Sequence, residues 1–191
     1  QFVRRWDMAA TEAKPGKDPD WTVGLLLGVS QNQTLYICDV KRLRGTPGTT
    51  EALVKQTAEI DGKSIPVRME QEPGSSGVTA IDGYSRRVLM GWDFRGIPST
   101  GSKEVRANPV ASQAEAGNIK IVRGPWINEF LDEAELFPLG SHDDQVDALS
   151  GALSDLVSTR DYGFSIAGEL PQEDLEGEDL VDKLDAAGMM T

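Results

Sequence analysis

Residues 21–29 read WTVGLLLGV and residues 34–41 read TLYICDVK, with the short polar turn QNQ at 31–33 between them. Both segments are rich in β-branched, aliphatic and aromatic residues, which favours β-strands, and a short turn between two such segments is typical of an antiparallel pair. Residues 2–8, FVRRWDM, alternate in the same way, so we expect a further strand before this pair. The three segments predict an antiparallel meander.

The rest of the chain alternates between helices and strands. We expect helices over 51–60, 78–90, 108–117, 126–136 and 141–157, and short strands over 64–70, 92–95 and 119–122. Asn108-Pro109 has the order of a cap followed by proline at the first helical position, and Ser141 and Asp144 have capping-box spacing. The order of elements predicts an α/β fold, with a mixed sheet and helices on its faces.

The composition excludes several kinds of site. The chain has one cysteine, Cys38, and one histidine, His142, which excludes a disulfide framework, a cysteine-ligated zinc site and a site with several histidine ligands. Any metal must be bound by carboxylate oxygens, which favours Mg²⁺, Mn²⁺ or Ca²⁺. No stretch approaches the roughly 18 consecutive apolar residues of a transmembrane helix, so we expect no membrane partner.

The negative charge is concentrated near the C-terminus. The 191 residues have a formal net charge of −12, and residues 161–185 contain nine acids and one base, Lys183. The first 160 residues therefore carry a net charge of −4, which does not exclude binding to nucleic acid. We predict a folded domain over residues 1–160 and an acidic, flexible tail over 161–191.

Carboxylates occupy three positions at the ends of predicted elements. Asp7 lies one residue from the end of the first strand, Glu70 ends the fourth, and residues 142–147, HDDQVD, open the last long helix. Taken singly, such acids are explained as turn residues or as charges favoured by the helix macrodipole. Taken together, they supply the oxygen ligands of a two-metal site, in which the ions lie about 4 Å apart. Asp18 and Asp20, in a loop with proline and glycine, are interpreted as turn residues.

The chain resembles the C-terminal nuclease domain of tailed-phage terminase large subunits, which has a ribonuclease H-like fold. The resemblance is carried by RWDMAAT at 5–11, DPDWTVG at 18–24, EQEPGSSG at 70–77, GSKEVRA at 101–107, EAGN at 115–118 and FPLGSHDDQVDA at 137–148. It covers about residues 2–158. It implies a five-stranded sheet in the order 3-2-1-4-5, with the first three strands antiparallel and the last two parallel to the first. Asp7 and Glu70 would then be neighbours.

The resemblance implies a two-metal-ion DNA endonuclease with two Mg²⁺ or Mn²⁺ ions. The catalytic and metal-binding residues that it implies are Asp7, Glu70, Asp144 and Asp147, with Asp7 bridging both ions. Glu70 is preferred to Glu72 because the family's ligand stands where the strand ends, and Glu72 lies past it.

The acids of the last helix have alternative interpretations. A buried apolar stripe would consist of Val146, Leu149, Leu153, Leu156 and Val157. This stripe places Asp143 and Asp147 beside it and turns Asp144 outward, where it would only cap the helix. The terminase pattern, and the Asp-x-x-Asp-Ala-Leu pattern of the related junction resolvases, rank Asp144 first, Asp147 second and Asp143 third. His142 either orients a water or contacts phosphate, or it is structural.

Lys103 and Arg106 are the candidate DNA-binding residues. They stand three apart near a helix and would hold the DNA backbone, although surface charge also explains them. The resemblance implies cutting of concatemeric double-stranded DNA at the initiation and end of genome packaging. In the full-length protein it implies an upstream ATPase domain, the portal and the terminase small subunit as partners, in the host cytoplasm and outside the mature virion. The alternatives are another ribonuclease H-like nuclease, of the junction resolvase or integrase type, and a non-catalytic DNA-clamping module.

Overall fold

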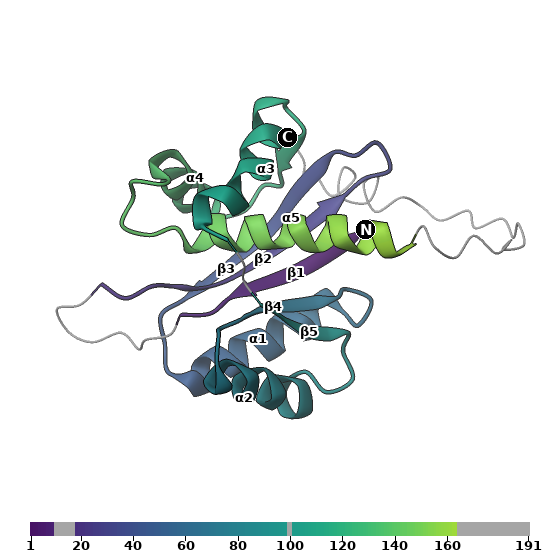
Figure 1. Ribbon diagram of the computed structural model, residues 1–191, viewed down its shortest axis with the longest axis vertical. Coiled ribbons are helices and arrows are strands. Elements are labelled where there is room, and N and C mark those ends of the chain that lie inside the picture. Colours follow the sequence, from purple (N-terminus) through teal and green to yellow (C-terminus); the bar gives the residue numbers. More distant parts are fainter. Residues whose placement is uncertain (10–17, 99–100, 164–191) are drawn as a thin grey trace, which may run out of the picture.

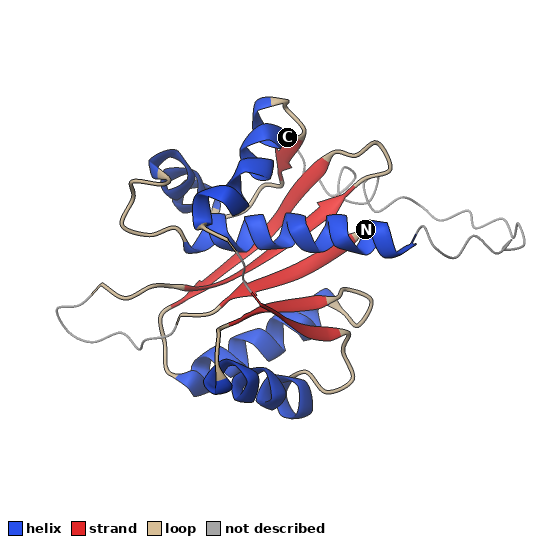
Figure 2. Cartoon of the chain, in the orientation of Figure 1, coloured by secondary structure: helices blue, strands red, loops and turns tan. Residues whose placement is uncertain are grey.

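The computed structural model describes residues 1–9, 18–98 and 101–163, which form one sheet with helices on both faces (Figures 1 and 2). In chain order the elements are β1 (Phe2–Asp7), β2 (Thr22–Val29), β3 (Leu35–Leu43), α1 (Pro47–Asp61), β4 (Val67–Gln71), α2 (Ser75–Gly83), the π-helical turn η1 (Tyr84–Val88), β5 (Phe94–Pro98), α3 (Lys103–Glu115), β6 (Ile119–Ile121), α4 (Ile127–Leu136) and α5 (Asp144–Gly163).

The sheet has the strand order β5-β4-β1-β2-β3-β6. β1, β2 and β3 pair antiparallel, whereas β4 pairs parallel with β1 and β5 parallel with β4. The expected order 3-2-1-4-5 is therefore confirmed, but the expected count of five strands is wrong. β6 adds a sixth strand, parallel to β3. Hydrogen bonds from Leu35 N to Asn118 O (2.8 Å) and from Val122 N to Ile37 O (2.9 Å) satisfy backbone groups at the edge of β3.

The two faces of the sheet have separate cores. Helices α3, α4 and α5 cover one face, and α1 and α2 cover the other (Figure 1). Because side chains alternate along a strand, β1 contributes to both cores. Val3 packs with residues of α4 and α5, and Trp6 packs with Val54 of α1. Asp7 therefore falls on the α5 side of the sheet.

Helix α3 starts earlier than the sequence indicates. Its N-cap is Ser102, whose side chain accepts a hydrogen bond from the N–H of Val105 at 3.4 Å. Pro109 lies inside the helix. The expected start at Asn108-Pro109 is wrong because the helix is already capped and wound before the proline, whose missing N–H removes a single backbone bond.

Helix α5 is the longest helix and packs across β1 and β2 (Figure 1). It runs to Gly163, beyond the expected domain boundary at residue 160. The expected tail over 161–191 lies outside the described residues from 164 onward. Within the described ranges, no helix combines the length and the apolar character needed to cross a membrane.

Candidate active site

Asp7 and Glu70 lie at the ends of two neighbouring parallel strands. β1 pairs with β4 in a register that places Trp6 opposite Met69, so Asp7 and Glu70 are the next residues along the two strands. Trp6 and Met69 are buried in the core under α1. Alternation therefore turns Asp7 and Glu70 toward the α5 face. The fold brings together two candidate ligands that are distant in sequence.

Asp7 lies within electrostatic range of three other acids. Burial raises the pKa of Asp7 well above its ordinary value. The negative charges of Glu70, Asp147 and Asp144 raise this pKa further, in that order, and the positive charge of Lys103 opposes them. The acids of β1, β4 and α5 therefore lie within electrostatic range of one another. Such a group favours protonation when it is free and a bound cation when one is supplied.

Asp144 opens α5 and has 6% of its surface exposed. Its Oδ2 accepts a hydrogen bond from the backbone N–H of Trp21 at 3.1 Å. Burial raises the pKa of Asp144 to about 6, although the bond from Trp21 lowers it. The helical-wheel expectation that Asp144 faces outward is wrong, because the chain before β2 covers this side of the helix. The same wheel expected Val157 to be buried, and Val157 is 51% exposed.

Asp147 binds two cations from α3. Its Oδ1 accepts a hydrogen bond from Arg106 at 2.8 Å, and its Oδ2 lies 3.0 Å from Lys103 Nζ. Lys103 also donates to Asp143 Oδ1 at 2.6 Å. Burial alone would lower the pKa of Lys103, but the hydrogen bonds to Asp143 and Asp147 outweigh it and raise that pKa. The two candidate DNA contacts therefore form one network with the acids of α5.

The sequence of the whole domain matches a known family. Residues 4–156 match the family described as the terminase RNaseH-like domain. The chain belongs to this family. The match includes β1, β4 and the first turns of α5, which carry the four candidate ligands. A search of curated protein sequences finds no match to this terminase domain.

Solved structures of viral nucleases share its fold. The nuclease domain of human cytomegalovirus terminase, soaked with manganese and bound to an inhibitor, has a TM-score of 0.61 at 14% identity, over 83% of this chain and 85% of that one. The large terminase nuclease of thermophilic phage G20c has a TM-score of 0.55 at 20% identity, over 80% of this chain and 81% of that one. The fowlpox virus Holliday junction resolvase has a TM-score of 0.50 at 13% identity, over 83% of this chain and 99% of that one. The terminase domain therefore has the expected ribonuclease H-like fold.

Glu72 stands apart from the carboxylate group. It is exposed in the turn between β4 and α2, after the strand has ended at Gln71. The carboxylate of Glu70 is 24% exposed and lies 4.0 Å from the guanidinium of Arg5, which faces α5. The structure thus places Glu70, and not Glu72, among the other candidate ligands.

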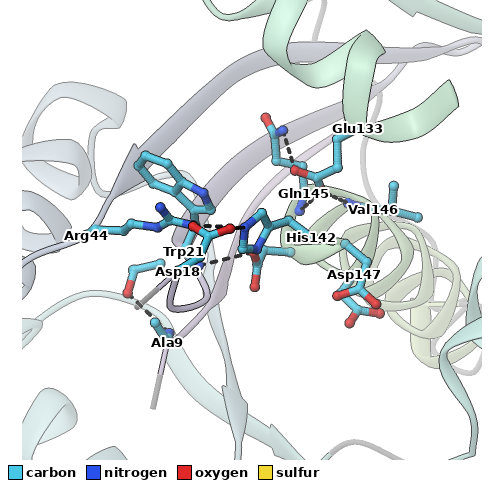
Figure 3. Close-up of polar contacts among 12 residues, drawn as sticks. Ala9, Asp18, Trp21, Arg44, Glu133, His142, Gln145, Val146 and Asp147 are labelled. Carbon is cyan, nitrogen blue, oxygen red and sulfur yellow. Dashed lines mark hydrogen bonds and ion pairs between the residues drawn. The ribbon is translucent and has the colours of Figure 1, made fainter. Parts of the chain in front are cut away.

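A second group of donor atoms adjoins Asp144. Ligand atoms of Asp20, His142 and Asp144 lie within 4.8 Å of one another, a spacing that suits a metal ion. His142 Nδ1 lies 3.8 Å from Asp144 Oδ2 and has no hydrogen-bond partner in the part of the chain that the structure describes. His142 Nε2 lies 2.7 Å from Asp18 Oδ2, and Asp18 also binds Arg44 (Figure 3).

The interpretation of Asp18 and Asp20 as turn residues is therefore incomplete, because this loop lies against the start of α5. A signal was present in the sequence. Two acids stand directly before a buried strand in DPDWTVG, one of the stretches that carries the resemblance. Their proximity to His142 requires a long-range contact that spacing alone does not reveal.

A groove of about 350 Å³ opens beside Glu70 and Asp147, between the β4–β5 edge of the sheet and α5. Its lining includes the polar side chains of Arg5, Arg106, Ser150, Ser154 and Ser158. Guanidinium and hydroxyl groups are among the side-chain groups that bind phosphodiester oxygens. The groove therefore offers polar contacts next to the carboxylate group.

Proposed function

We propose that this terminase domain is a two-metal-ion endonuclease that cuts concatemeric double-stranded DNA at the initiation and at the end of viral genome packaging. The observation that carries the proposal is the convergence of Asp7, Glu70 and Asp144 from three elements of the fold, with Asp147 beside them. Membership of the terminase family supports a nuclease, and the manganese-soaked cytomegalovirus neighbour supports a metal of this class.

The donor set fits Mg²⁺ or Mn²⁺. Asp7, Glu70, Asp144 and Asp147 offer carboxylate oxygens, the donors that these cations prefer. Burial raises the pKa values of Asp7 and Asp144, and the negative charges of neighbouring acids raise them further. A bound divalent cation would stabilise the ionised carboxylates against both effects. When bound, two ions would activate a water and stabilise the charge on the leaving 3′ oxygen.

The chain's own residues would hold the metal and the substrate. Asp7, Glu70, Asp144 and Asp147 would hold the ions, with Asp7 as the ligand that the family resemblance would share between them. The effect of the other three acids on the pKa of Asp7 supports their proximity. Lys103 and Arg106 are 51% and 22% exposed, so DNA phosphates can reach both from solvent. Because these contacts are to the backbone, we expect little sequence preference.

In the full-length protein, we expect an upstream ATPase domain, with the portal and the terminase small subunit as partners, acting in the host cytoplasm. The domain would cut DNA that the ATPase domain moves. Membership of the terminase family supports this expectation.

Holliday junction resolution is the second candidate function. It is favoured by the likeness to the fowlpox virus resolvase, which covers 99% of that chain. A non-catalytic clamp is disfavoured because acids occupy all three carboxylate positions, at Asp7, Glu70 and the start of α5.

A cleavage assay on two substrates separates these functions. Supercoiled plasmid and a synthetic four-way junction are incubated with Mn²⁺, Mg²⁺ or EDTA, with Asp7→Asn as the matched inactive control. We expect cleavage of the plasmid with either metal and none with EDTA. Preferential cutting of the junction would favour the resolvase, and no cleavage of either substrate would favour the clamp.

A further inference from the structure

We infer that Glu133, on α4, is a positioning residue for this site: its carboxylate caps the N-terminus of α5 and thereby holds the acids of the first turn in place. The inference rests on the proposed function, because it concerns Asp144 and Asp147 as metal ligands.

The N-terminus of α5 is capped from another helix. The N–H of Asp147 donates to the carbonyl of Asp143 at 2.8 Å, so Asp143 occupies the N-cap position. The N–H groups of Gln145 and Val146 lie in the first turn, where no carbonyl of the helix accepts from them. Both donate to Glu133 Oε1, at 2.6 and 3.3 Å, and the side-chain amide of Gln145 donates to Glu133 Oε2 at 2.7 Å (Figure 3).

This arrangement leaves the aspartates available for other contacts. An N-cap side chain ordinarily accepts hydrogen bonds from these N–H groups. The carboxylate of Asp143 instead binds Lys103, and that of Asp144 binds the N–H of Trp21. The expected capping box between Ser141 and Asp144 is therefore wrong. Because Glu133 supplies the cap, α5 needs no acid of its own first turn for this purpose.

The contact between α4 and α5 is buried. Glu133 is 8% exposed and Gln145 is fully buried, and the amide of Gln145 also donates to the carbonyl of Glu129 at 3.2 Å. The N–H donors and the positive end of the helix dipole stabilise the buried charge of Glu133. Gln145 points to α4, whereas Asp144 and Asp147 contact the β2 side and α3. The first turn is thus held from one side while its acids face the other.

Removal of the cap should disturb metal binding more than the fold. Without acceptors, the N–H groups of Gln145 and Val146 are left buried, and the turn that carries Asp144 and Asp147 loosens. Groups that support metal ligands typically change metal affinity by roughly 10- to 100-fold when they are replaced. We therefore expect Glu133→Leu to raise the Mn²⁺ concentration for half-maximal cleavage at least about 10-fold.

A conservative variant separates the hydrogen bonds from the charge. In Glu133→Gln, the new amide oxygen can still accept from both backbone N–H groups. Its NH₂ group would then face Gln145, whose Oε1 is buried and has no hydrogen-bond partner among the described residues. A rotation of the Gln145 amide supplies the missing acceptor and gives up the hydrogen bond to the carbonyl of Glu129. We expect Glu133→Gln to keep the wild-type Mn²⁺ requirement within about 3-fold, since it changes no ligand.

The experiment compares wild type, Glu133→Leu, Glu133→Gln and the control Glu135→Leu, which alters an exposed acid of the same helix. Three quantities are measured: the Mn²⁺ dependence of plasmid cleavage, the Mn²⁺-induced rise in melting temperature, and hydrogen exchange at the amides of Gln145 and Val146. We expect Glu133→Leu to lose amide protection and Mn²⁺ affinity, while Glu133→Gln and Glu135→Leu retain both. A wild-type Mn²⁺ requirement in folded Glu133→Leu would overturn the inference.

A second variant covers the case in which Glu133→Leu does not fold. Glu133→Asp keeps the charge but withdraws the carboxylate by one methylene. We expect smaller losses of amide protection and of Mn²⁺ affinity than in Glu133→Leu. Unchanged amide exchange and Mn²⁺ requirement in this variant would overturn the inference. Failure of the proposed function looks different, because the wild type itself would then cut no DNA with Mn²⁺.

Discussion

The amino group of Lys103 lies 3.0 Å from Asp147 Oδ2 and so brings a positive charge from α3 to the acids of α5. The same group binds Asp143 at 2.6 Å, so Lys103 is shared between two carboxylates. Under the proposed function, divalent ions and Lys103 would compete for these acids, and DNA phosphates would compete with the acids for Lys103. Metal binding at α5 should therefore release Lys103 toward DNA.

The first prediction concerns this exchange. Lys103→Ala should weaken binding to duplex DNA in the presence of Ca²⁺ and reduce the slope of log K against log salt concentration by about one, as expected for the loss of one phosphate contact. Fluorescence anisotropy at several salt concentrations measures the slope. Lys120→Ala, at an exposed position of β6, is the control. An unchanged slope in Lys103→Ala would show that this residue serves the acids of α5 and not DNA.

The second prediction concerns pH and the metal-free protein. The pKa of Asp144 is about 6 in the folded state against an ordinary value of 3.8, so the folded state binds the proton more tightly. This contribution to stability is complete below pH 3.8 and is lost as the pH rises through 6. Between pH 5 and pH 7, the melting temperature of the wild type should fall more steeply than that of Asp144→Asn.

Thermal melts in EDTA measure this difference, with Asp132→Asn, at an exposed site of α4, as the control. Because metal ligands must be deprotonated, the rise in melting temperature caused by Mn²⁺ should be larger at pH 7.5 than at pH 5.5. Parallel curves for wild type and Asp144→Asn would mean that Asp144 does not bind this proton.

The third prediction ranks the acids at the strand ends. Asp7→Asn should abolish cleavage, and Glu70→Gln should do nearly the same, because each removes a proposed ligand while it keeps the side-chain shape. The loss should be on the order of 100-fold or more in rate. Glu72→Gln, at the exposed turn, should cost little and serves as the control. An inactive Glu72→Gln variant beside an active Glu70→Gln variant would show that Glu72, and not Glu70, is the ligand.

The fourth prediction ranks the acids of α5. Asp144→Asn should reduce cleavage most, Asp147→Asn less and Asp143→Asn least. Asp147→Asn should also lower the melting temperature, because it weakens the pairing of a buried carboxylate with Lys103 and Arg106. Cleavage rates and melting temperatures measured on the same preparations separate the two effects. Normal cutting by Asp144→Asn, beside an inactive Asp143→Asn or Asp147→Asn, would contradict this ranking.

Local patterns in the sequence were sufficient to predict most of the elements. Strands β1, β2 and β3 can be predicted from their alternation and composition. A strand in a half-buried sheet favours β-branched and aromatic side chains whichever strand lies next to it. The strand order came from the family resemblance, because the pairing of β1 with β4 joins residues far apart in the chain. The place of β6 at the edge of β3 was missed for the same reason.

The sequence indicates which acids stand at the ends of elements, but it does not indicate which residues contact them. The acids Asp7, Glu70 and Asp144 stand at element ends that the sequence marks. The burial of Asp144 depends on Trp21, and the cap of α5 depends on Glu133 of a different helix. Neither neighbour is visible to a helical wheel, which placed Asp144 outward, or to the capping-box spacing, which assigned the cap to Ser141.

Plasmid cleavage as a function of Mn²⁺ concentration, in wild type and Asp7→Asn side by side, tests the central claim most directly. The account predicts that the wild-type rate rises from zero in EDTA to saturation with Mn²⁺. It also predicts that folded Asp7→Asn shows no cutting at any concentration. Cleavage by the wild type in EDTA, or equal cleavage by Asp7→Asn, would contradict it.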